Sequence, residues 1–278
     1  MLYLVATPIG NLGDISHRMT ETLAKVDFIA AEDTRVTRRL LAHLGIKKTL
    51  LSYFAHNRRK RGEEILTRLQ QGQSCALVCD AGTPAISDPG EELVALCIEQ
   101  GISVVSIPGP CAAIAALVAS GLPTGRFCFE GFLSTTKKNR IAHLEQLKEE
   151  PRSIVFYEAP HKLLYTLSDI LHVWGNRKIS IGRELTKYHE EMIYTTLSAA
   201  VLRFSKEAEK PRGEFVLVIE GAAEPAESSC STDALVLAKL RLNELIDEGL
   251  SRKDAVRKCT EETGIPKNVL YTESLRDA

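Results

Sequence analysis

Short hydrophobic runs alternate with longer amphipathic segments through the first 120 residues of the 278-residue chain. This alternation is typical of βαβ units, in which strands form a largely parallel sheet and helices cover it. The fold class that it indicates is α/β. The pattern predicts strands at 2–6, 27–31, 49–52, 75–79 and 103–107, and helices at 16–25, 34–44, 58–71, 90–100 and 111–120.

A second α/β region follows residues 121–125, where two glycines and a proline interrupt a long helical run. Such breaks are common at domain boundaries. We therefore predict one α/β domain over residues 1–121 and another over residues 122–221. The second should contain strands at 127–131, 153–157, 178–184, 190–196 and 215–220, and helices at 137–149, 161–174 and 197–205.

The end of the chain differs from both regions. Residues 222–232 are mostly small or polar, which is typical of a linker, and residues 233–278 predict a small helical tail. Its helices are expected at 233–249, 251–263 and 266–275. The tail resembles a helix-turn-helix in outline, but its charges nearly balance. Packing or dimerisation is therefore as good an interpretation as contact with nucleic acid.

The composition, 44% hydrophobic and 26% charged, is ordinary for a soluble globular protein. Apolar stretches such as 111–119 are too short to span a membrane, and the N-terminus has no basic segment ahead of a signal core. We therefore expect a cytoplasmic protein with no membrane role. Seven cysteines lie mostly in apolar segments and seven histidines lack metal-ligand spacing, so we expect reduced core cysteines and no metal site.

The net charge of −1 conceals an uneven distribution, because residues 35–61 include nine basic residues and no acidic one. One interpretation is a solvated helix face followed by a loop. The other is a nucleic-acid surface, since the run itself contains no acidic partner. The nine residues are Arg35, Arg38, Arg39, Lys47, Lys48, Arg58, Arg59, Lys60 and Arg61.

The sequence LVCDAGTPAISDPG at 77–90 combines a hydrophobic strand with a Gly/Pro-rich loop that holds two aspartates, a threonine and a serine. It lacks the glycine pattern of dinucleotide-binding loops, and no phosphate-binding P-loop occurs anywhere in the chain. The loops at 7–11, 80–89 and 108–110 each follow a predicted strand. In open α/β sheets such loops converge on one crevice at the carboxyl ends of the strands, where ligands bind.

Three more polar clusters also stand at strand ends. The sequence AEDTR at 31–35 places Glu32, Asp33 and Arg35 where a strand meets a helix, although Asp33 or Thr34 could simply cap that helix. The sequences FYEAPH at 156–161 and RELTK at 183–187 end strands in the second half. Each alone could be ordinary surface, but their recurrence at strand ends favours a ligand site.

Eight motifs, taken in order, closely resemble the tetrapyrrole methylase superfamily over essentially the whole chain. Within it they resemble the branch that methylates the ribose 2′-oxygen of a cytidine in small-subunit (16S) ribosomal RNA. The resemblance implies two α/β domains of the tetrapyrrole methylase type with S-adenosylmethionine in the cleft between them, and a homodimer. The motifs are ATPIGNLGD (6–14), AEDTR (31–35), DAGTPAISDPG (80–90), IPGP (107–110), EGFL (130–133), FYEAPH (156–161), RELTK (183–187) and GEFVLVIEG (213–221).

The resemblance also implies where the donor binds. One departure is Cys111, where a serine is common in the family, and this nearly isosteric change places one hydrogen bond in doubt. The residues expected to bind S-adenosylmethionine are Pro8, Ile9, Asp80, Gly82, Thr83, Ile86, Ser87, Ala112, Ala113, Tyr157, Leu185, Gly213, Glu214 and Phe215.

A sulfonium methyl donor is already activated, so an enzyme that uses it must mainly align the acceptor oxygen and remove a proton. Ribose hydroxyls are weakly acidic, and the candidates for a base or a charge-stabilising group are Glu32, Asp33, Glu184 and Lys187, which the sequence does not rank. Phosphates suit arginine forks. The arginines expected to bind RNA are Arg35, Arg38, Arg39, Arg58 and Arg59.

Two other functions remain open at this point. One is a methyltransferase of the same fold that acts on a tetrapyrrole, which would need a few cations rather than an extended basic surface. The other is a ribosome-assembly protein that binds RNA without catalysis. The expected acceptor is small-subunit ribosomal RNA or the assembled small subunit, since a splayed nucleotide in an RNA loop can reach a cleft more readily than one in a duplex.

Overall fold

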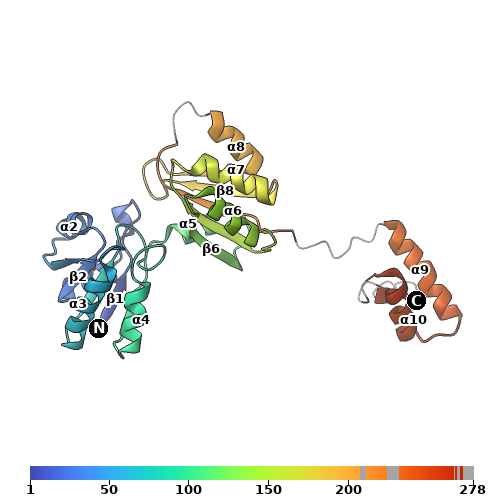
Figure 1. Cartoon of the computed structure of the whole chain (residues 1–278), viewed down its shortest axis with the longest axis horizontal. Coiled ribbons are helices and arrows are strands. Elements are labelled where there is room, and N and C mark those ends of the chain that lie inside the picture. Colours follow the sequence, from blue (N-terminus) through green and yellow to red (C-terminus); the bar gives the residue numbers. More distant parts are fainter. Residues whose placement is uncertain (207–210, 224–231, 266, 268–269, 272–278) are drawn as a thin grey trace. The chain divides into compact units, whose positions relative to one another are not determined.

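The structure is a computed structural model that describes residues 1–206, 211–223, 232–265, 267 and 270–271. It consists of two compact units, residues 1–222 and residues 223–278. Figure 1 shows the helices and strands of both units. Each unit has its own hydrophobic core. The two units are therefore described separately.

The first sheet of the larger unit is fully parallel, with strand order β3-β2-β4-β1-β5. This confirms the predicted parallel sheet, and the expected strands match to within one or two residues. Because β1 and β4 are central neighbours, the loops that follow them emerge side by side. The strands are β1 (Leu2–Val5), β2 (Phe28–Ala31), β3 (Thr49–Ser52), β4 (Cys75–Val78) and β5 (Val104–Ile107).

Helices cover both faces of this sheet. On one face α1 (His17–Lys25) and α2 (Thr34–His43) bury Met19, Leu23 and Leu41 against the strands. On the other face α3 (Arg58–Gln70) and α4 (Glu91–Glu99) bury their own apolar stripes. Helix α1 begins after Ser16, whose hydroxyl accepts a hydrogen bond from the Met19 amide. A short 3₁₀ helix, η1 (Leu12–Asp14), follows the first loop.

The second sheet has the order β6-β7-β10-β8-β9, and only its β6–β7 pair is parallel. Three helices lie over one face (Figure 1). The core between these helices and the sheet includes the buried Phe156 and Trp174. The elements are β6 (Phe127–Phe132), α6 (Lys137–Gln146), β7 (Ser153–Glu158), α7 (Leu163–Trp174), β8 (Lys178–Arg183), β9 (Glu191–Thr196), α8 (Leu197–Lys206) and β10 (Phe215–Ile219).

Helix α5 (Ala112–Ala119) follows the last strand of the first sheet but packs on the second sheet. Its Ala116 and Leu117 are buried with Val155 of β7 and Val218 of β10. The small side chains of Ala113 and Ala116 suit the side of the helix that is buried against the sheet, whereas Ile114 and Val118 are exposed. The boundary that we predicted at residue 121 stays a prediction, and the structure adds that the packing partner of the chain changes before that residue.

The smaller unit contains α9 (Thr232–Asp247) and α10 (Arg252–Thr263). Its core includes Leu242, Val256 and Ile265, and the Ser251 side chain caps α10. Most of the predicted linker and of the predicted third helix lies outside the described residues. Within the described residues no helix is both long and apolar enough to cross a membrane.

Candidate active site

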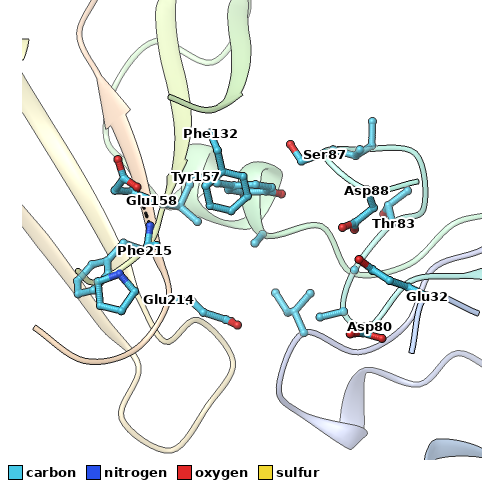
Figure 2. Close-up of a pocket in the computed structure, with 18 residues that line it drawn as sticks. Glu32, Asp80, Thr83, Ser87, Asp88, Phe132, Tyr157, Glu158, Glu214 and Phe215 are labelled. Carbon is cyan, nitrogen blue, oxygen red and sulfur yellow. Dashed lines mark hydrogen bonds between the residues drawn. The ribbon is translucent and has the colours of Figure 1, made fainter. Parts of the chain in front are cut away.

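A cavity of about 430 Å³ opens in the larger unit where loops of the first sheet face strand ends of the second. Figure 2 shows two groups of side chains on opposite sides of it. We call Glu32 and residues 80–88 the acidic wall, and Phe132, Tyr157 and Phe215 the aromatic wall. The lining residues are Ile9, Glu32, Asp80, Ala81, Gly82, Thr83, Ile86, Ser87, Asp88, Ala112, Phe132, Tyr157, Glu158, Ala159, Pro160, Glu214, Phe215 and Val216.

The loop of the acidic wall has an unusual backbone. Gly82 has φ +86° and exchanges two backbone hydrogen bonds with Thr7, of 2.8 and 3.0 Å, which join the loops after β1 and β4. A Cβ at Gly82 would lie 3.3 Å from Ile9 Cγ2, so this position combines a left-handed backbone with little space. Ala85 and Ser87 also have positive φ. Strain of this kind is typical of ligand-binding loops.

Three carboxyl groups of the acidic wall share a partly buried environment. Burial raises the pKa of Glu32, and the nearby Asp88 and Asp80 carboxylates raise it further. Burial also raises the pKa values of Asp80 and Asp88. Asp80 accepts a hydrogen bond of 3.0 Å from the Asp33 amide, which connects the β2 and β4 loops. The acidic wall is therefore suited to a cationic ligand or to accepting a proton.

The aromatic wall is built on strands instead of loops. The Tyr157 hydroxyl accepts a hydrogen bond of 3.2 Å from the Ala113 amide at the start of α5, and it lies 4.0 Å from Cys111 Sγ. Burial raises the pKa of Tyr157 above the ordinary tyrosine value. The Phe132 ring is 5.5 Å from the Tyr157 ring, and Phe129 packs against Tyr157 from within β6.

Of the four predicted catalytic residues, Glu32 is the one found among the described residues that line the cavity. Asp33 caps α2 by accepting a hydrogen bond from the Arg35 amide, and the Arg35 guanidinium binds both of its carboxylate oxygens. The hydrogen bonds from Arg35 lower the pKa of Asp33 to about 2. A carboxyl of that pKa is a weak base at neutral pH. The capping role that we considered for Asp33 is present.

Glu184 and Lys187 pair with each other beside the cavity. Lys187 Nζ is 2.7 Å from Glu184 Oε1 and 3.0 Å from Glu214 Oε2. Burial raises the pKa of Glu184, but the hydrogen bond from Lys187 and others outweigh it and leave the pKa lowered. The Lys187 stem lies close to Gly10, where an added Cβ would be 2.4 Å from Lys187 Cγ. The Lys187 stem therefore packs closely against the first loop at Gly10.

Ten of the fourteen predicted donor-binding residues line the cavity. The other four are near it in different ways. Pro8 lines a smaller hollow, Ala113 donates to Tyr157, and Leu185 is buried against Ile9. Gly213 has φ +99°, and an added Cβ there would be 2.6 Å from Glu184 Cγ. The position requires glycine for conformation and for space.

The predicted RNA-binding arginines fall into two groups. Arg35 is bound by Asp33, and Arg58 lies 3.2 Å from Glu92, so acidic partners outside the basic run neutralise part of it. In the described part of the chain, Arg38, Arg39 and Arg59 make no ion pair, and all three are exposed. The unpaired arginines are the better candidates for phosphate contacts.

Sequence reasoning missed several lining residues, including Asp88, Phe132, Glu158 and Pro160. Asp88 is the second aspartate of the 80–90 loop, and Glu158 and Pro160 belong to FYEAPH. Both motifs therefore indicated a ligand site, but not which of their residues line it. Phe132 ends a strand in EGFL and carries no polar signal. Among the described residues, no group of three or more His, Cys, Asp and Glu side chains is arranged to hold a metal. Six described cysteines are free, and Cys230 lies outside the described residues.

Together, a parallel α/β sheet, a mixed second sheet and a cavity between strand-end loops define a two-sheet α/β enzyme fold with a crevice for a small organic ligand. The family model of the tetrapyrrole (corrin/porphyrin) methylases matches residues 1–201, and the chain belongs to that family. This confirms the family, the α/β fold and the methyltransferase class expected from the motifs.

Relatives within the family are similar over nearly their full length. The chain is 51% identical to the ribosomal RNA small subunit methyltransferase I of a Synechocystis strain over 276 residues, which is 99% of this chain and 97% of the relative. It is 46% identical to the protein of the same name from Halalkalibacterium halodurans, over 97% of this chain and 93% of that one.

Solved structures of low identity show the same fold. A uroporphyrin-III C-methyl transferase from Thermus thermophilus, complexed with S-adenyl homocysteine, matches with a TM-score of 0.54 at 15% identity. The match covers 78% of this chain and 96% of that one. A conserved hypothetical protein from Aeropyrum pernix matches with a TM-score of 0.63 at 15% identity, over 81% and 85% of the two chains.

Proposed function

We propose that the chain transfers a methyl group from S-adenosylmethionine to the ribose 2′-oxygen of a cytidine in small-subunit ribosomal RNA. The names of its relatives support the RNA acceptor. The observation that carries the reaction is a cavity with an acidic wall containing Glu32 on one side and an aromatic wall on the other. We further propose that the protein acts in the cytoplasm as a homodimer.

The residues of the cavity fit S-adenosylmethionine. Its volume, about 430 Å³, lies within the range of small-molecule sites. The carboxylates of Glu32, Asp80 and Asp88 complement a cationic ligand, and Gly82 leaves room for backbone contact where a Cβ would approach Ile9. The apolar lining formed by Ile9, Ile86 and Val216 complements an adenine ring. When bound, S-adenosylmethionine supplies an activated methyl group.

We assign Glu32 as the general base. The raised pKa brings this carboxyl closer to the operating pH, where a base is more effective, and its side chain faces the cavity. Asp33 forms an ion pair with Arg35 and caps α2, and Glu184 forms an ion pair with Lys187. Their proposed roles are thus to order the loops around the cavity. Lys187 lies in the same loop as Glu184 and joins that loop to Glu214, which directly precedes β10.

The RNA strand should approach along α2. A smaller hollow of about 260 Å³ is lined by Pro8, Arg39 and His43 and shares Asp80 with the main cavity. Phosphate groups bound by Arg38 and Arg39 would then place an adjacent nucleotide at the cavity. Arginine forks bind phosphate strongly, and such binding weakens as salt concentration rises.

The test is methyl transfer from labelled S-adenosylmethionine to unmodified small ribosomal subunits and to their extracted RNA, followed by nucleoside mass spectrometry. We expect 2′-O-methylcytidine as the product. Incorporation into neither substrate while the donor binds would exclude the proposed acceptor and favour the tetrapyrrole alternative. Calorimetry with S-adenosylmethionine distinguishes both from an RNA-binding protein without catalysis, which would bind no donor.

A double charge reversal, Arg38→Glu with Arg39→Glu, tests the RNA surface. Since two phosphate contacts become repulsive, we expect methylation of subunits to be abolished while donor affinity stays unchanged. The matched control is Arg126→Glu with Lys148→Glu, two exposed cations on the other half of the larger unit. Equal losses in both double variants would mean that net charge, and not this surface, governs RNA binding.

A further inference from the structure

Phe132 is a large apolar side chain that remains 54% exposed at the edge of the cavity. Single exposed apolar residues are common on protein surfaces, but this one is part of an organised wall. Its ring is tilted by 56° to the Tyr157 ring at 5.5 Å, and Lys162 Nζ lies 5.6 Å from its centre. An exposed ring with a cation beside it is the arrangement that binds unpaired nucleobases.

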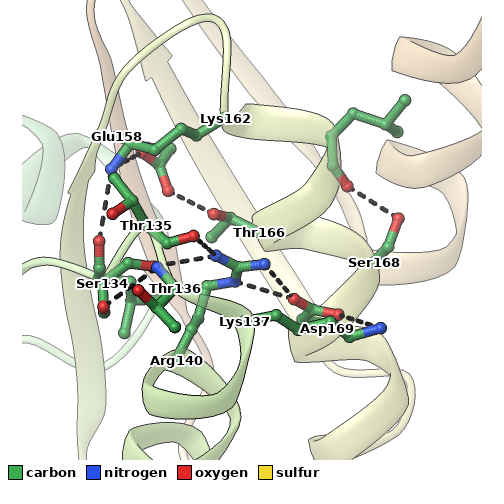
Figure 3. Close-up of polar contacts among 12 residues, drawn as sticks. Ser134, Thr135, Thr136, Lys137, Arg140, Glu158, Lys162, Thr166, Ser168 and Asp169 are labelled. Atoms are coloured by element: carbon green, nitrogen blue, oxygen red, sulfur yellow. Dashed lines mark hydrogen bonds and ion pairs between the residues drawn. The ribbon is translucent and has the colours of Figure 1, made fainter.

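The segment that carries Phe132 is tied to α7 by two groups of buried charges (Figure 3). In the first, Glu158 is 2% exposed and pairs with Lys162 at 3.0 Å. The Glu158 carboxylate also accepts hydrogen bonds from the Ala159 amide and the Thr166 hydroxyl. Lys162 in turn donates to the Leu133 carbonyl at 3.3 Å, next to Phe132.

The second group fixes the residues that follow. Arg140 is 7% exposed and binds Asp169 through two nitrogens, at 2.6 and 2.8 Å. It also donates to the carbonyls of Ser134 and Thr135, at 2.9 and 3.2 Å. Buried ion pairs are costly to form and contribute little net stability, so we infer that these pairs serve to fix one geometry. Here that geometry is the position of the chain directly after Phe132.

We propose that Phe132 is the platform on which the base of the acceptor nucleotide stacks, held in place by the Glu158–Lys162 and Arg140–Asp169 pairs. This rests on the proposed function, since it requires an RNA acceptor. The opposite wall carries Glu32, so a nucleotide whose base stacks on Phe132 would have its ribose in the same cavity as this carboxylate (Figure 2). Donor binding and base binding then use different parts of one cavity.

The experiment compares Phe132→Ala, Phe132→Leu and Phe132→Trp in methylation of unmodified small subunits. Because one base loses its aromatic partner, we expect Phe132→Ala to raise KM for subunits by roughly tenfold with a smaller change in kcat. Leucine keeps the apolar contact without a π face and should remain impaired, whereas tryptophan should restore KM to near the original value. Tyr165→Ala, which removes a ring that is 69% exposed on α7, is the control and should change nothing.

The donor is measured separately in the same variants. Calorimetry should give Phe132→Ala an unchanged affinity for S-adenosylmethionine, and the fluorescence of Phe132→Trp should not change when the donor is added. Weaker donor binding or quenching by the donor would place the adenine at this ring and overturn the proposal. So would an unchanged KM in Phe132→Ala, or a KM effect that tracks a change in oligomeric state by sedimentation. If the unaltered protein methylates no subunits, the proposed function fails instead.

Discussion

The two walls of the cavity are built by different means. The acidic wall comes from loops that follow β2 and β4 of the parallel sheet, and its backbone includes left-handed conformations at Gly82, Ala85 and Ser87. The aromatic wall comes from residues within β6, β7 and β10 of the mixed sheet. The Tyr157 hydroxyl is bonded to α5, and the Leu133 carbonyl next to Phe132 is bonded to Lys162 at the start of α7.

This difference indicates a division of work. Loops at the ends of parallel strands can bring carboxylates and backbone amides together without a regular spacing, which suits charge recognition and proton transfer. Strands hold side chains more rigidly, which suits the stacking of flat rings. The acidic wall also lowers the free energy of unfolding, because partly buried carboxyl groups and strained residues are unfavourable until a ligand is present.

Among the substitutions that would distinguish the roles of the two walls, the largest effect is expected for Glu32→Gln. Glutamine keeps the shape of the side chain but cannot accept the proton, so kcat should fall by about 100- to 10,000-fold. Single-turnover kinetics would measure this fall in rate. Filter binding should show that the affinity for the RNA is nearly unchanged. Glu99→Gln, an exposed position on α4, is the control. A tenfold or smaller loss in Glu32→Gln would assign the base to another group.

Gly82→Val should have the next largest effect, by blocking the donor. The residue has φ +86°, and a Cβ would meet Ile9 Cγ2 at 3.3 Å, so valine strains the loop and fills the cavity edge. We therefore expect the affinity for S-adenosylmethionine, measured by calorimetry, to fall by at least about tenfold. This corresponds to a loss of about 1.4 kcal/mol of binding free energy.

Gly72→Val is the matched control for that substitution. Gly72 has a similar φ of +88°, but no atom lies within 4 Å of an added Cβ. Valine has an unfavourable φ in both variants, but only Gly82 lies at the cavity. Equal donor affinities in the two variants would show that the loop after β4 does not bind the donor.

The local sequence pattern predicted the acidic wall, apart from Asp88, better than the aromatic wall, of which Tyr157 and Phe215 were expected from the family resemblance and Phe132 was missed. Charged and Gly/Pro-rich strand ends can be recognised from the sequence alone, because turn residues and carboxylates stand out immediately after a hydrophobic run. The 80–90 loop and Glu32 were found in this way. Phe132 was not, since an aromatic residue at a strand end has the same local pattern whether it is packed or exposed. Its exposure depends on partners far away in sequence.

Long-range packing also explains the other differences. The expected strands and helices depend on local periodicity and matched the structure closely, but the docking of α5 on the second sheet depends on contacts with β7 and β10. Similarly, the basic run contains no acid of its own, yet Glu92 on α4 pairs with Arg58. No spacing rule relates residues so far apart in the sequence.

Asp88→Asn should alter the acidic wall more subtly, through its charge. Removing the Asp88 carboxylate lowers the pKa of Glu32, so the acidic limb of the kcat/KM profile should move to lower pH. The pKa of Asp88 itself is raised on folding, so its stabilising contribution is present below the unfolded pKa and is lost as pH rises through the folded value. The variant should therefore melt at a higher temperature than the original protein at pH 7.

That gain should disappear at a pH below the ordinary carboxyl range, where the aspartate is protonated in both states. Glu99→Gln, again the control, should change neither the melting temperature nor the pH profile. If Asp88→Asn left the acidic limb where it was, the group titrating in the profile would not be a neighbour of Asp88, and the assignment of Glu32 as the base would lose its electrostatic support.

The smallest effect is expected at the aromatic wall, for Tyr157→Phe. The substitution keeps the ring that packs against Phe129 and Phe132 but removes the hydroxyl that accepts from the Ala113 amide. A partly buried N–H without a partner should lower the free energy of unfolding by about 1 kcal/mol in urea titration. Tyr165→Phe is the control for loss of an exposed hydroxyl. If the aromatic rings bind the acceptor base and the Tyr157 hydroxyl does not, KM for subunits should stay within about twofold of the original value, because the stacking surface is retained. A KM increase as large as that of Phe132→Ala would mean that the anchoring of α5, and not the exposed ring, positions the acceptor.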